Sequence, residues 1–173
     1  GDQADPRNYS KAQYETRIEA LVEMMEEVKF HEISTQFVPP ALTPDHLVID
    51  GLFGSGLNKP LSGGFAAVVK YINSSPAMVV AIDIPSGLMG EENTFNVKAN
   101  IIRADVTFSL QLPKLAFLFA ENTEFVGEWE VLDIQLSKDG IEEMETNYEM
   151  LEIEQIRSLI KPRKQFAHKG NLS

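Results

Sequence analysis

The hydrophobic pattern of the chain centres on two short apolar runs with a helical repeat between them. The runs are Leu47–Ile49 and Val79–Ile82, and both have the length and β-branched content of buried parallel strands. A helix is predicted between them, with Ser62 as its cap, because apolar residues recur there at helical spacing: Phe65, Val68, Val69 and Ile72. Since strand–helix–strand crossovers are right-handed, the two strands should be parallel, with the helix on one face.

The pattern on either side predicts further elements. Ser10 to Gln13 have the spacing of a capping box, and the apolar stripe of a helix follows: Tyr14, Ile18, Leu21, Val22 and Met25. A short strand is expected at Val28–Ile33, and a short helix around 150–160. Three later strands are also predicted, and some of them could be antiparallel at the edge of the sheet: Val106–Leu110, Leu115–Phe119 and Glu128–Ile134. These elements together indicate an α/β fold with a mostly parallel sheet.

Both central strands end in an aspartate, Asp50 and Asp83, and each aspartate is followed by a turn rich in Gly, Pro and Ser. In an open α/β sheet, ligands bind in the crevice beyond the carboxyl ends of the strands. We therefore expect the two acids to lie at the same edge of the sheet, at the rim of one site.

Composition limits the classes of function. With 173 residues and 43% apolar content, the chain is long enough for one globular domain. It has no cysteine, no long apolar run and no signal-peptide pattern, so a soluble, cytoplasmic protein without disulfides is expected. The formal net charge of -11 argues against nucleic acid or an anionic membrane as a partner. The formation of a homo-oligomer is not excluded by this composition.

The glycines after Asp50 match neither of two familiar phosphate-binding motifs. Gly51 and Gly56 have the glycine spacing of a P-loop, but Leu57 and Asn58 stand where Lys and Ser or Thr are required. The spacing of a dinucleotide-binding fingerprint is absent as well. Two interpretations remain open. The glycines could only form a tight turn that Asp50 caps, or they could let backbone N–H groups approach an anion such as a pyrophosphate.

The second turn, from Asp83 to Gly87, offers oxygen atoms. The hydroxyl and carbonyl of Ser86, close to an aspartate, are oxygen ligands of the kind that suits a hard cation. A nucleophilic role for Ser86 is disfavoured, because the residue lacks a G-x-S-x-G setting and no histidine is obviously paired with it. Lys114 follows a predicted strand and could place a positive charge at the same rim, although a solvated lysine is an equal alternative.

The central segments VIDGLFGSGLNKPLSG, VVAIDIPSGL, ADVTFSLQLPKLAFLFAEN and VGEWEVLDI resemble the NAD(P)H-hydrate epimerase family, the YjeF N-terminal domain, over roughly residues 46 to 136. The resemblance implies a Rossmann-like three-layer αβα sandwich. It also implies epimerisation of the R and S forms of hydrated NADH and NADPH (NADHX and NADPHX), which prepares these damaged cofactors for repair by a dehydratase.

Site residues follow from the same resemblance. It implies a potassium ion bound by Asp50 and Ser86, and a substrate contact by Asp83 near the reacting ring. The substrate-binding loop would be formed by consecutive residues: Gly54, Ser55, Gly56, Leu57, Asn58, Lys59 and Pro60. Asp83 is our candidate acid/base, and for that role we expect partial burial to raise its pKa towards neutrality. The alternative is that Asp83 only hydrogen-bonds the ribose or the carboxamide.

The ends of the chain also bear on domain organisation. Residues 161–171 resemble the opening of the ADP- or ATP-dependent dehydratase domain of bifunctional repair enzymes, so we expect a partial epimerase domain at 1–137 and a linker with the start of the dehydratase domain at 138–173. The family's glycine-rich G-N-N-G-G-D-G segment does not occur before Ser10. The sequence therefore suggests a piece of a longer protein, and a non-catalytic nucleotide- or protein-binding module of the same fold is the alternative function.

Overall fold

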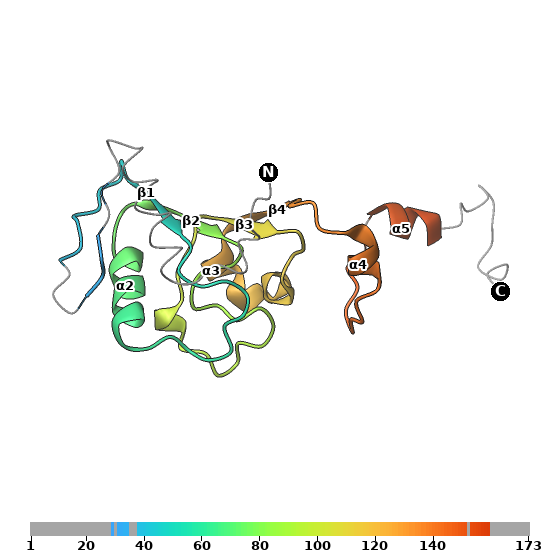
Figure 1. The fold of residues 1–173 in the computed structure, drawn as a ribbon, viewed down its shortest axis with the longest axis horizontal. Coiled ribbons are helices and arrows are strands. Elements are labelled where there is room, and N and C mark those ends of the chain that lie inside the picture. Colours follow the sequence, from blue (N-terminus) through green and yellow to red (C-terminus); the bar gives the residue numbers. More distant parts are fainter. Residues whose placement is uncertain (1–28, 30, 35–37, 152, 160–173) are drawn as a thin grey trace, which may run out of the picture.

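The computed structural model describes residues 29, 31–34, 38–151 and 153–159, and within them a four-stranded sheet carries the fold (Figure 1). The strand order is β1-β2-β3-β4, and every neighbouring pair is parallel. The strands are β1 (Leu47–Asp50), β2 (Met78–Ile82), β3 (Val106–Leu110) and β4 (Glu128–Leu132). The parallel sheet predicted from the apolar runs is confirmed, and no described pair is antiparallel.

The predicted strand–helix–strand unit is present. Helix α2 (Gly63–Asn73) connects β1 to β2, and Ser62 occupies its N-cap position, although the Ser62 side chain makes no capping hydrogen bond. Ala66 and Val69 are the buried residues of α2, which places one stripe of the helix against the sheet. The βα turn before this helix is the glycine loop, which we define as residues 51–60.

Two strand predictions are wrong. Leu115–Leu118 form a 3-10 helix, η3, in place of a strand. The backbone N–H of Ala116 donates to Gly90 O, and the Asn122 side-chain amide donates to Ala116 O, so this segment bonds to loops and not to a neighbouring strand. A short apolar run does not by itself distinguish a strand from a buried helical turn. Residues 29 and 31–33 belong to no strand either.

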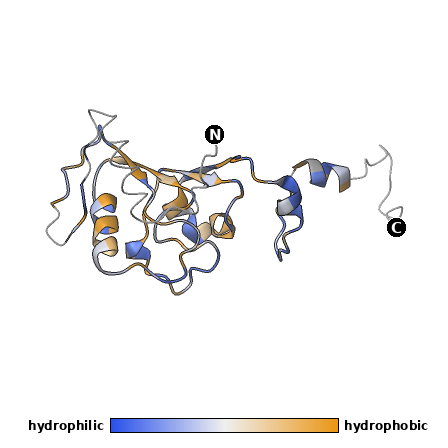
Figure 2. Cartoon of the chain, in the orientation of Figure 1, coloured by the Kyte–Doolittle hydropathy of each residue, from blue (hydrophilic) through white to orange (hydrophobic). Residues whose placement is uncertain are grey.

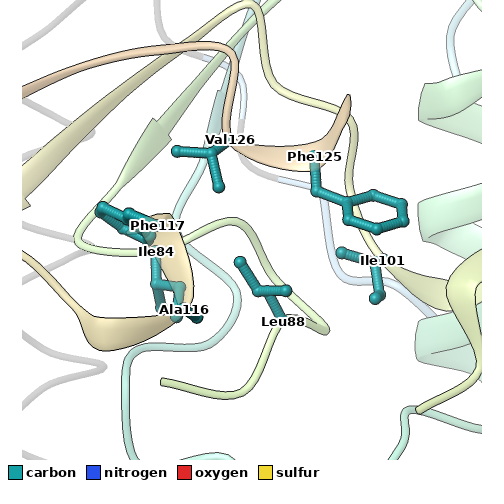
Figure 3. Close-up of a cluster of buried hydrophobic side chains, with 7 residues drawn as sticks. All are labelled: Ile84, Leu88, Ile101, Ala116, Phe117, Phe125 and Val126. Carbon is teal, nitrogen blue, oxygen red and sulfur yellow. The ribbon is translucent and has the colours of Figure 1, made fainter. Parts of the chain in front are cut away.

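The core consists of two clusters of buried side chains. One lies between α2 and the sheet and contains Leu61, Val69, Val79, Ala81, Ile102 and Ala104. The other lies under the segments that follow β2 and β3, and Figure 3 shows its members: Ile84, Leu88, Ile101, Ala116, Phe117, Phe125 and Val126. Burying one such large side chain stabilises the fold by about 1.5–3 kcal/mol. The second cluster fixes the turn after β2, because Ile84 and Leu88 flank it.

Helices α2 and α3 cover one face of the sheet. Figure 1 shows α2 and the four-residue helix α3 (Thr123–Val126) on the same side of the strands. Residues that point to this side, such as Val79 and Ala81, are buried, whereas Leu47, Ile49 and Met78 on the opposite side are exposed. The α/β Rossmann-like class is confirmed. The helix predicted after Ser10 lies outside the described residues.

Beyond β4 the chain leaves the sheet. Helices α4 (Lys138–Glu142) and α5 (Ile153–Leu159) extend away from the strands (Figure 1), and in Figure 2 hydrophobic colours gather along the sheet while α4 is largely hydrophilic. Helix α5 confirms the short helix predicted around 150–160. The remaining 3-10 turns are η2 (Lys98–Asn100) and η4 (Ala120–Asn122). Among the described residues, no helix is long and apolar enough to cross a membrane. The dehydratase-like segment at 161–171 lies outside the described residues.

Candidate active site at the carboxyl edge of the sheet

Asp50 and Asp83 lie at the same edge of the sheet, as predicted. Asp50 is the last residue of β1, and Asp83 directly follows β2, the parallel neighbour of β1. Because the carboxyl ends of parallel strands meet at one edge, both side chains start at the rim where ligands of α/β folds bind. The two acids nevertheless have different surroundings, and the surroundings determine what each can do.

Asp50 is a buried carboxylate held by the turn after β2. Its side chain accepts two hydrogen bonds from Ser86, one from the backbone N–H at 2.7 Å and one from the hydroxyl at 2.6 Å. The Ser86 hydroxyl in turn accepts a hydrogen bond from Phe53 N at 3.0 Å, which ties the glycine loop to the same network. Asp50 is 2% exposed and Ser86 is fully buried. The network therefore holds the glycine loop and the turn after β2 together.

The oxygen atoms of Asp50 and Ser86 fit a hard monovalent cation such as potassium. The Asp50 carboxylate is buried and forms no ion pair with any described residue, although buried charges usually have a partner of opposite charge. Carboxylate and hydroxyl oxygens are ligands of hard cations. The Ser86 carbonyl already accepts a hydrogen bond from Ile102 N. In the described part of the chain, no three His, Cys, Asp or Glu residues are grouped so that they could hold a metal ion.

Asp83 sits at a sharp bend of the backbone. Its φ angle is +71°, in the left-handed region that Asp tolerates better than most residues, and its N–H donates to Phe108 O at 2.7 Å across the sheet. The bend turns the chain out of β2 at the point where the side chain reaches the rim. Residues held in such rare backbone conformations are often found at functional sites.

The Asp83 carboxylate forms an ion pair with Lys114, so this lysine places its charge at the rim and the solvated alternative is wrong. Lys114 Nζ lies 2.7 Å from Oδ1, and the backbone N–H groups of Ser55 and Leu110 donate to Oδ2 and Oδ1 at 3.2 and 3.4 Å. The side chains of Lys114 and Asp83 are 16% and 18% exposed. Asp83 is therefore bonded to both the glycine loop and the segment after β3.

The ion pair reverses the pKa expected for Asp83. Burial acts to raise the pKa, but the hydrogen bond and charge of Lys114 and the backbone N–H groups of Ser55 and Leu110 outweigh it, so the pKa lies below its ordinary value of 3.8. The expectation of a raised pKa is wrong because it considered burial without the lysine. In this structure Asp83 is a carboxylate at neutral pH.

At two glycines of the glycine loop, the space that a side chain would occupy is empty. A Cβ atom added to Gly51 or Gly56 would meet no atom within 4 Å, and neither residue has a positive φ angle. At these two positions the described turn itself does not require glycine. Gly54 is different, since a Cβ there would lie only 3.3 Å from the Asp83 carboxylate. The steric demands of a tight turn therefore do not account for glycine at positions 51 and 56.

The other predicted loop residues divide into anchors and exposed groups. Leu57 and Pro60 are half-buried, and Leu57 packs against the cluster beneath α2. The exposed residues of the predicted substrate loop are Gly54, Ser55, Gly56, Asn58 and Lys59. The loop is thus fixed at its apolar positions and presents polar groups to solvent beside Asp83.

Sequence reasoning missed Asn100, which supports this loop. Its side-chain amide donates to Leu61 O at 2.7 Å, just after the glycine loop, and its own buried Oδ1 has no hydrogen-bond partner among the described residues. A single asparagine in an irregular stretch carries no pattern that would have revealed it. Two cavities of about 230 and 240 Å³ lie elsewhere in the described residues, and neither is lined by Asp50 or Asp83.

Comparison with known proteins places this geometry in a family. The profile described as "YjeF-related protein N-terminus" matches residues 4–116, more than half of the chain. A relative from Thermofilum pendens, named bifunctional NAD(P)H-hydrate repair enzyme Nnr, is 34% identical over 167 residues, which cover 93% of this chain and 29% of the relative.

Two other relatives have related names. The NAD(P)H-hydrate epimerase of Limosilactobacillus fermentum is 31% identical over 60% of this chain and 49% of its own length. The bifunctional NAD(P)H-hydrate repair enzyme Nnr of Escherichia coli is 30% identical over 72% of this chain and 24% of its own length. The chain thus spans less than half of each of these relatives, and it belongs to the family of YjeF-related proteins, whose N-terminal domain it carries over residues 4–116.

Proposed function

We propose that this chain acts in the epimerisation of NADHX and NADPHX, as the epimerase part of a nicotinamide-cofactor repair enzyme. The observation that carries the proposal is a carboxylate, Asp83, that lies at the ligand-binding edge of a parallel sheet and is bonded to the glycine loop beside it. Relatives with this domain are named NAD(P)H-hydrate epimerases. The hydrated nicotinamide ring would lie against Asp83.

The reaction needs one group that gives and takes a proton. The hydroxyl on the hydrated ring carbon takes a proton from the Asp83 carboxyl group, the carbon–oxygen bond breaks, and water leaves as the ring-nitrogen lone pair forms an iminium. Water then adds to the opposite face of the ring, the electron pair returns to nitrogen, and the Asp83 carboxylate takes the proton back. Each cycle therefore returns Asp83 to its starting state.

The ionised state of Asp83 gives this reaction a pH dependence. Because the pKa of Asp83 is lowered by its partners, the carboxyl form that starts the cycle is a minor species at neutral pH. The rate should therefore fall as the pH rises, provided that proton transfer limits it. Because Lys114 helps to lower this pKa, the ion pair between Lys114 and Asp83 affects the pH dependence of the epimerisation rate.

The rest of the cofactor would bind along the glycine loop. Gly51 and Gly56 leave backbone groups uncovered, and the loop leads into the N-terminus of α2, where peptide N–H groups favour an anion. A pyrophosphate is the anion of the proposed substrate that suits this place. Lys59, exposed in the same loop, adds a positive charge.

Potassium is the proposed bound ion. Asp50 and Ser86 would hold it with carboxylate and hydroxyl or carbonyl oxygens, and the ion would supply a positive charge beside a buried carboxylate that has no other charged partner among the described residues. The two residues also connect the glycine loop to the turn after β2. The ion would therefore stabilise the binding edge.

An epimerisation assay tests the function. A single epimer of NADHX, prepared separately, is incubated with this chain, and the appearance of the other epimer is followed by chromatography. The Escherichia coli repair enzyme serves as the positive control, and the Asp83→Asn variant as the negative one. Conversion of the epimer at a rate above the spontaneous rate in buffer supports the proposal. A rate equal to the spontaneous rate overturns it.

One observation favours a second function. An ionised, ion-paired Asp83 can accept a hydrogen bond from a ribose hydroxyl or a carboxamide without any proton exchange. A non-catalytic nucleotide-binding module would use the same residues. Saturable binding of NADPHX without epimerisation would identify this alternative.

A further inference from the structure

Lys114 is the charged group closest to the proposed reacting carboxylate. Its ammonium group lies 2.7 Å from Asp83 Oδ1 and also reaches Leu112 O, Ser109 Oγ and Leu110 O at 3.1, 3.3 and 3.4 Å. All four acceptors surround one nitrogen, and the side chain is 16% exposed. With only three N–H donors, the ammonium group is fully used by protein acceptors.

The segment that carries Lys114 is itself held in place. Gln111 has a φ angle of +62°, and its N–H donates to Leu132 O of β4. The Ser109 hydroxyl donates to Leu112 O at 2.7 Å, and Ala116 N donates to Gly90 O at 2.9 Å. These bonds fix the chain on both sides of Lys114, so the ammonium group has little freedom to leave Asp83.

We propose that Lys114 is a positioning residue for the epimerisation: it fixes the orientation and the charge state of the Asp83 carboxylate that meets the substrate. The inference rests on the proposed function of this site. Lys114 does not itself reach the substrate, because its N–H groups point to protein oxygens. It acts through Asp83, by binding Oδ1 and so holding the carboxylate with Oδ2 towards the glycine loop, where Ser55 N donates to it.

The other neighbours of Asp83 cannot supply this effect. Within the described residues, the groups bonded to the carboxylate are Lys114 and the backbone N–H groups of Ser55 and Leu110. Gly54 lies against the carboxylate but has no side chain. Lys114 is therefore the single titratable group that the described structure places against it. Burial acts to raise the pKa of Asp83, and among the groups that lower it Lys114 has the largest effect, ahead of the two backbone N–H groups.

Two kinds of variant separate positioning from a merely structural role. Lys114→Met removes the charge and keeps the stem, whereas Lys114→Arg keeps a charge near the carboxylate. The matched control is Lys70→Met on the exposed side of α2, which makes the same change in net charge away from the site. Epimerisation is measured between about pH 4 and pH 9, with kcat and KM determined separately.

The proposal predicts a change in the shape of the pH profile. In Lys114→Met, the fall of kcat with rising pH begins at a higher pH than in the wild type, because the neutral acid persists longer, and its maximum is roughly 10- to 100-fold lower through lost orientation. Lys114→Arg restores the position of the profile, and Lys70→Met leaves it unchanged. A Lys114→Met profile that is lower everywhere but has the same shape and position overturns the proposal.

A spectroscopic titration keeps the test independent of turnover. The carboxyl carbons of aspartate are labelled with carbon-13, and the Asp83 signal is assigned by its loss in Asp83→Asn. The proposal expects this signal to titrate at a higher pH in Lys114→Met than in the wild type, and equal midpoints overturn it. Absence of epimerisation by the wild type overturns the proposed function instead, while the titration still decides whether Lys114 sets the charge of Asp83. Circular dichroism verifies that each variant is folded.

Discussion

Asp83 combines a rare backbone conformation with a carboxylate whose two oxygens both accept hydrogen bonds from the protein. Its φ angle of +71° and its ion pair with Lys114 both restrict the side chain to one orientation. Strained backbone and perturbed pKa values are found together at many catalytic sites, where the rest of the fold supports the cost. Asp50, by contrast, is satisfied by Ser86 in a buried position. The two strand-end acids therefore have different surroundings.

Asp83→Asn should abolish proton exchange and spare the fold. Asparagine tolerates the left-handed backbone and keeps most of the hydrogen-bonding shape, but it does not carry the proton. We expect the epimerisation rate to fall by roughly 10²- to 10⁴-fold, with substrate binding changed only a few-fold. The rate is measured with a single epimer, and binding by isothermal calorimetry.

The exposed Asp45, in the turn before β1, provides the matched control. Asp45→Asn makes the same change in charge and should leave the rate as it is. Epimerisation within a few-fold of wild type in Asp83→Asn, accompanied by weaker binding, would show that Asp83 is a binding residue.

The lowered pKa of Asp83 also makes stability depend on pH. Because the folded-state pKa lies below 3.8, the ion pair contributes stability that is fully present above the unfolded-state pKa and is lost as the pH falls through the folded-state pKa. Thermal unfolding of the wild type and Asp83→Asn is compared from neutral pH downward. The stability difference should shrink below about pH 4. A difference that stays constant into strong acid would contradict the linkage.

At the scale of elements, the turn after β2 is the most constrained segment of the site. Gly87 has a φ angle of +97°, and a Cβ atom there would lie 2.2 Å from Asn100 O. Ser86 O accepts a hydrogen bond from Ile102 N, which connects the turn after β2 to the segment after η2. The core residues Ile84 and Leu88 hold the turn from both ends (Figure 3).

Gly87→Ala should therefore destabilise the domain. Any side chain would need both the unfavourable φ angle and a displacement of the backbone at Asn100, and we expect a loss of more than about 2 kcal/mol in the free energy of unfolding. Denaturant titration measures the loss. Gly51→Ala is the control, because its Cβ enters open space, and its stability should stay within about 0.5 kcal/mol of wild type. Similar stability of the two variants would refute the argument.

At the scale of the whole molecule, the negative net charge bears on the buried acid of the site. The chain carries a net charge of -11, and among the described residues the buried Asp50 has no cationic partner. Adding a cation at this position would stabilise the folded state, because a ligand that binds only the folded state lowers its free energy. The ion would also act on the sheet edge where the glycine loop and the turn after β2 meet.

Potassium should raise the melting temperature of the wild type relative to tetramethylammonium at equal ionic strength. Stabilisation reaches about 2.7 kcal/mol when the ion is at about 100 times its Kd. Asp50→Asn removes the charge, so its melting temperature should be the same in the two salts, even if the variant is less stable than the wild type. Asp45→Asn should keep the difference. Equal melting temperatures in both salts for the wild type would remove the basis for a potassium site.

The sequence by itself determined the elements with strong periodicity and the edge where the acids lie. The β1–α2–β2 unit was predicted because β-branched runs and a helical repeat are local signals, and Asp50 and Asp83 had to share an edge once their strands were parallel. The segment at Leu115–Leu118 was missed because its apolar side chains suit a strand and a buried 3-10 turn equally. Burial patterns alone do not separate these alternatives.

Only the tertiary structure decided the charge and the bonding partners of Asp83. Its charge depends on Lys114, 31 positions away in the chain, and on backbone N–H groups of two other segments. Likewise, only the folded chain brings Phe53 N to the Ser86 hydroxyl and Asn100 to the end of the glycine loop. Local propensity acts over a few residues, whereas the electrostatic energy of a carboxylate depends on every group within a few ångströms, whatever its place in the sequence.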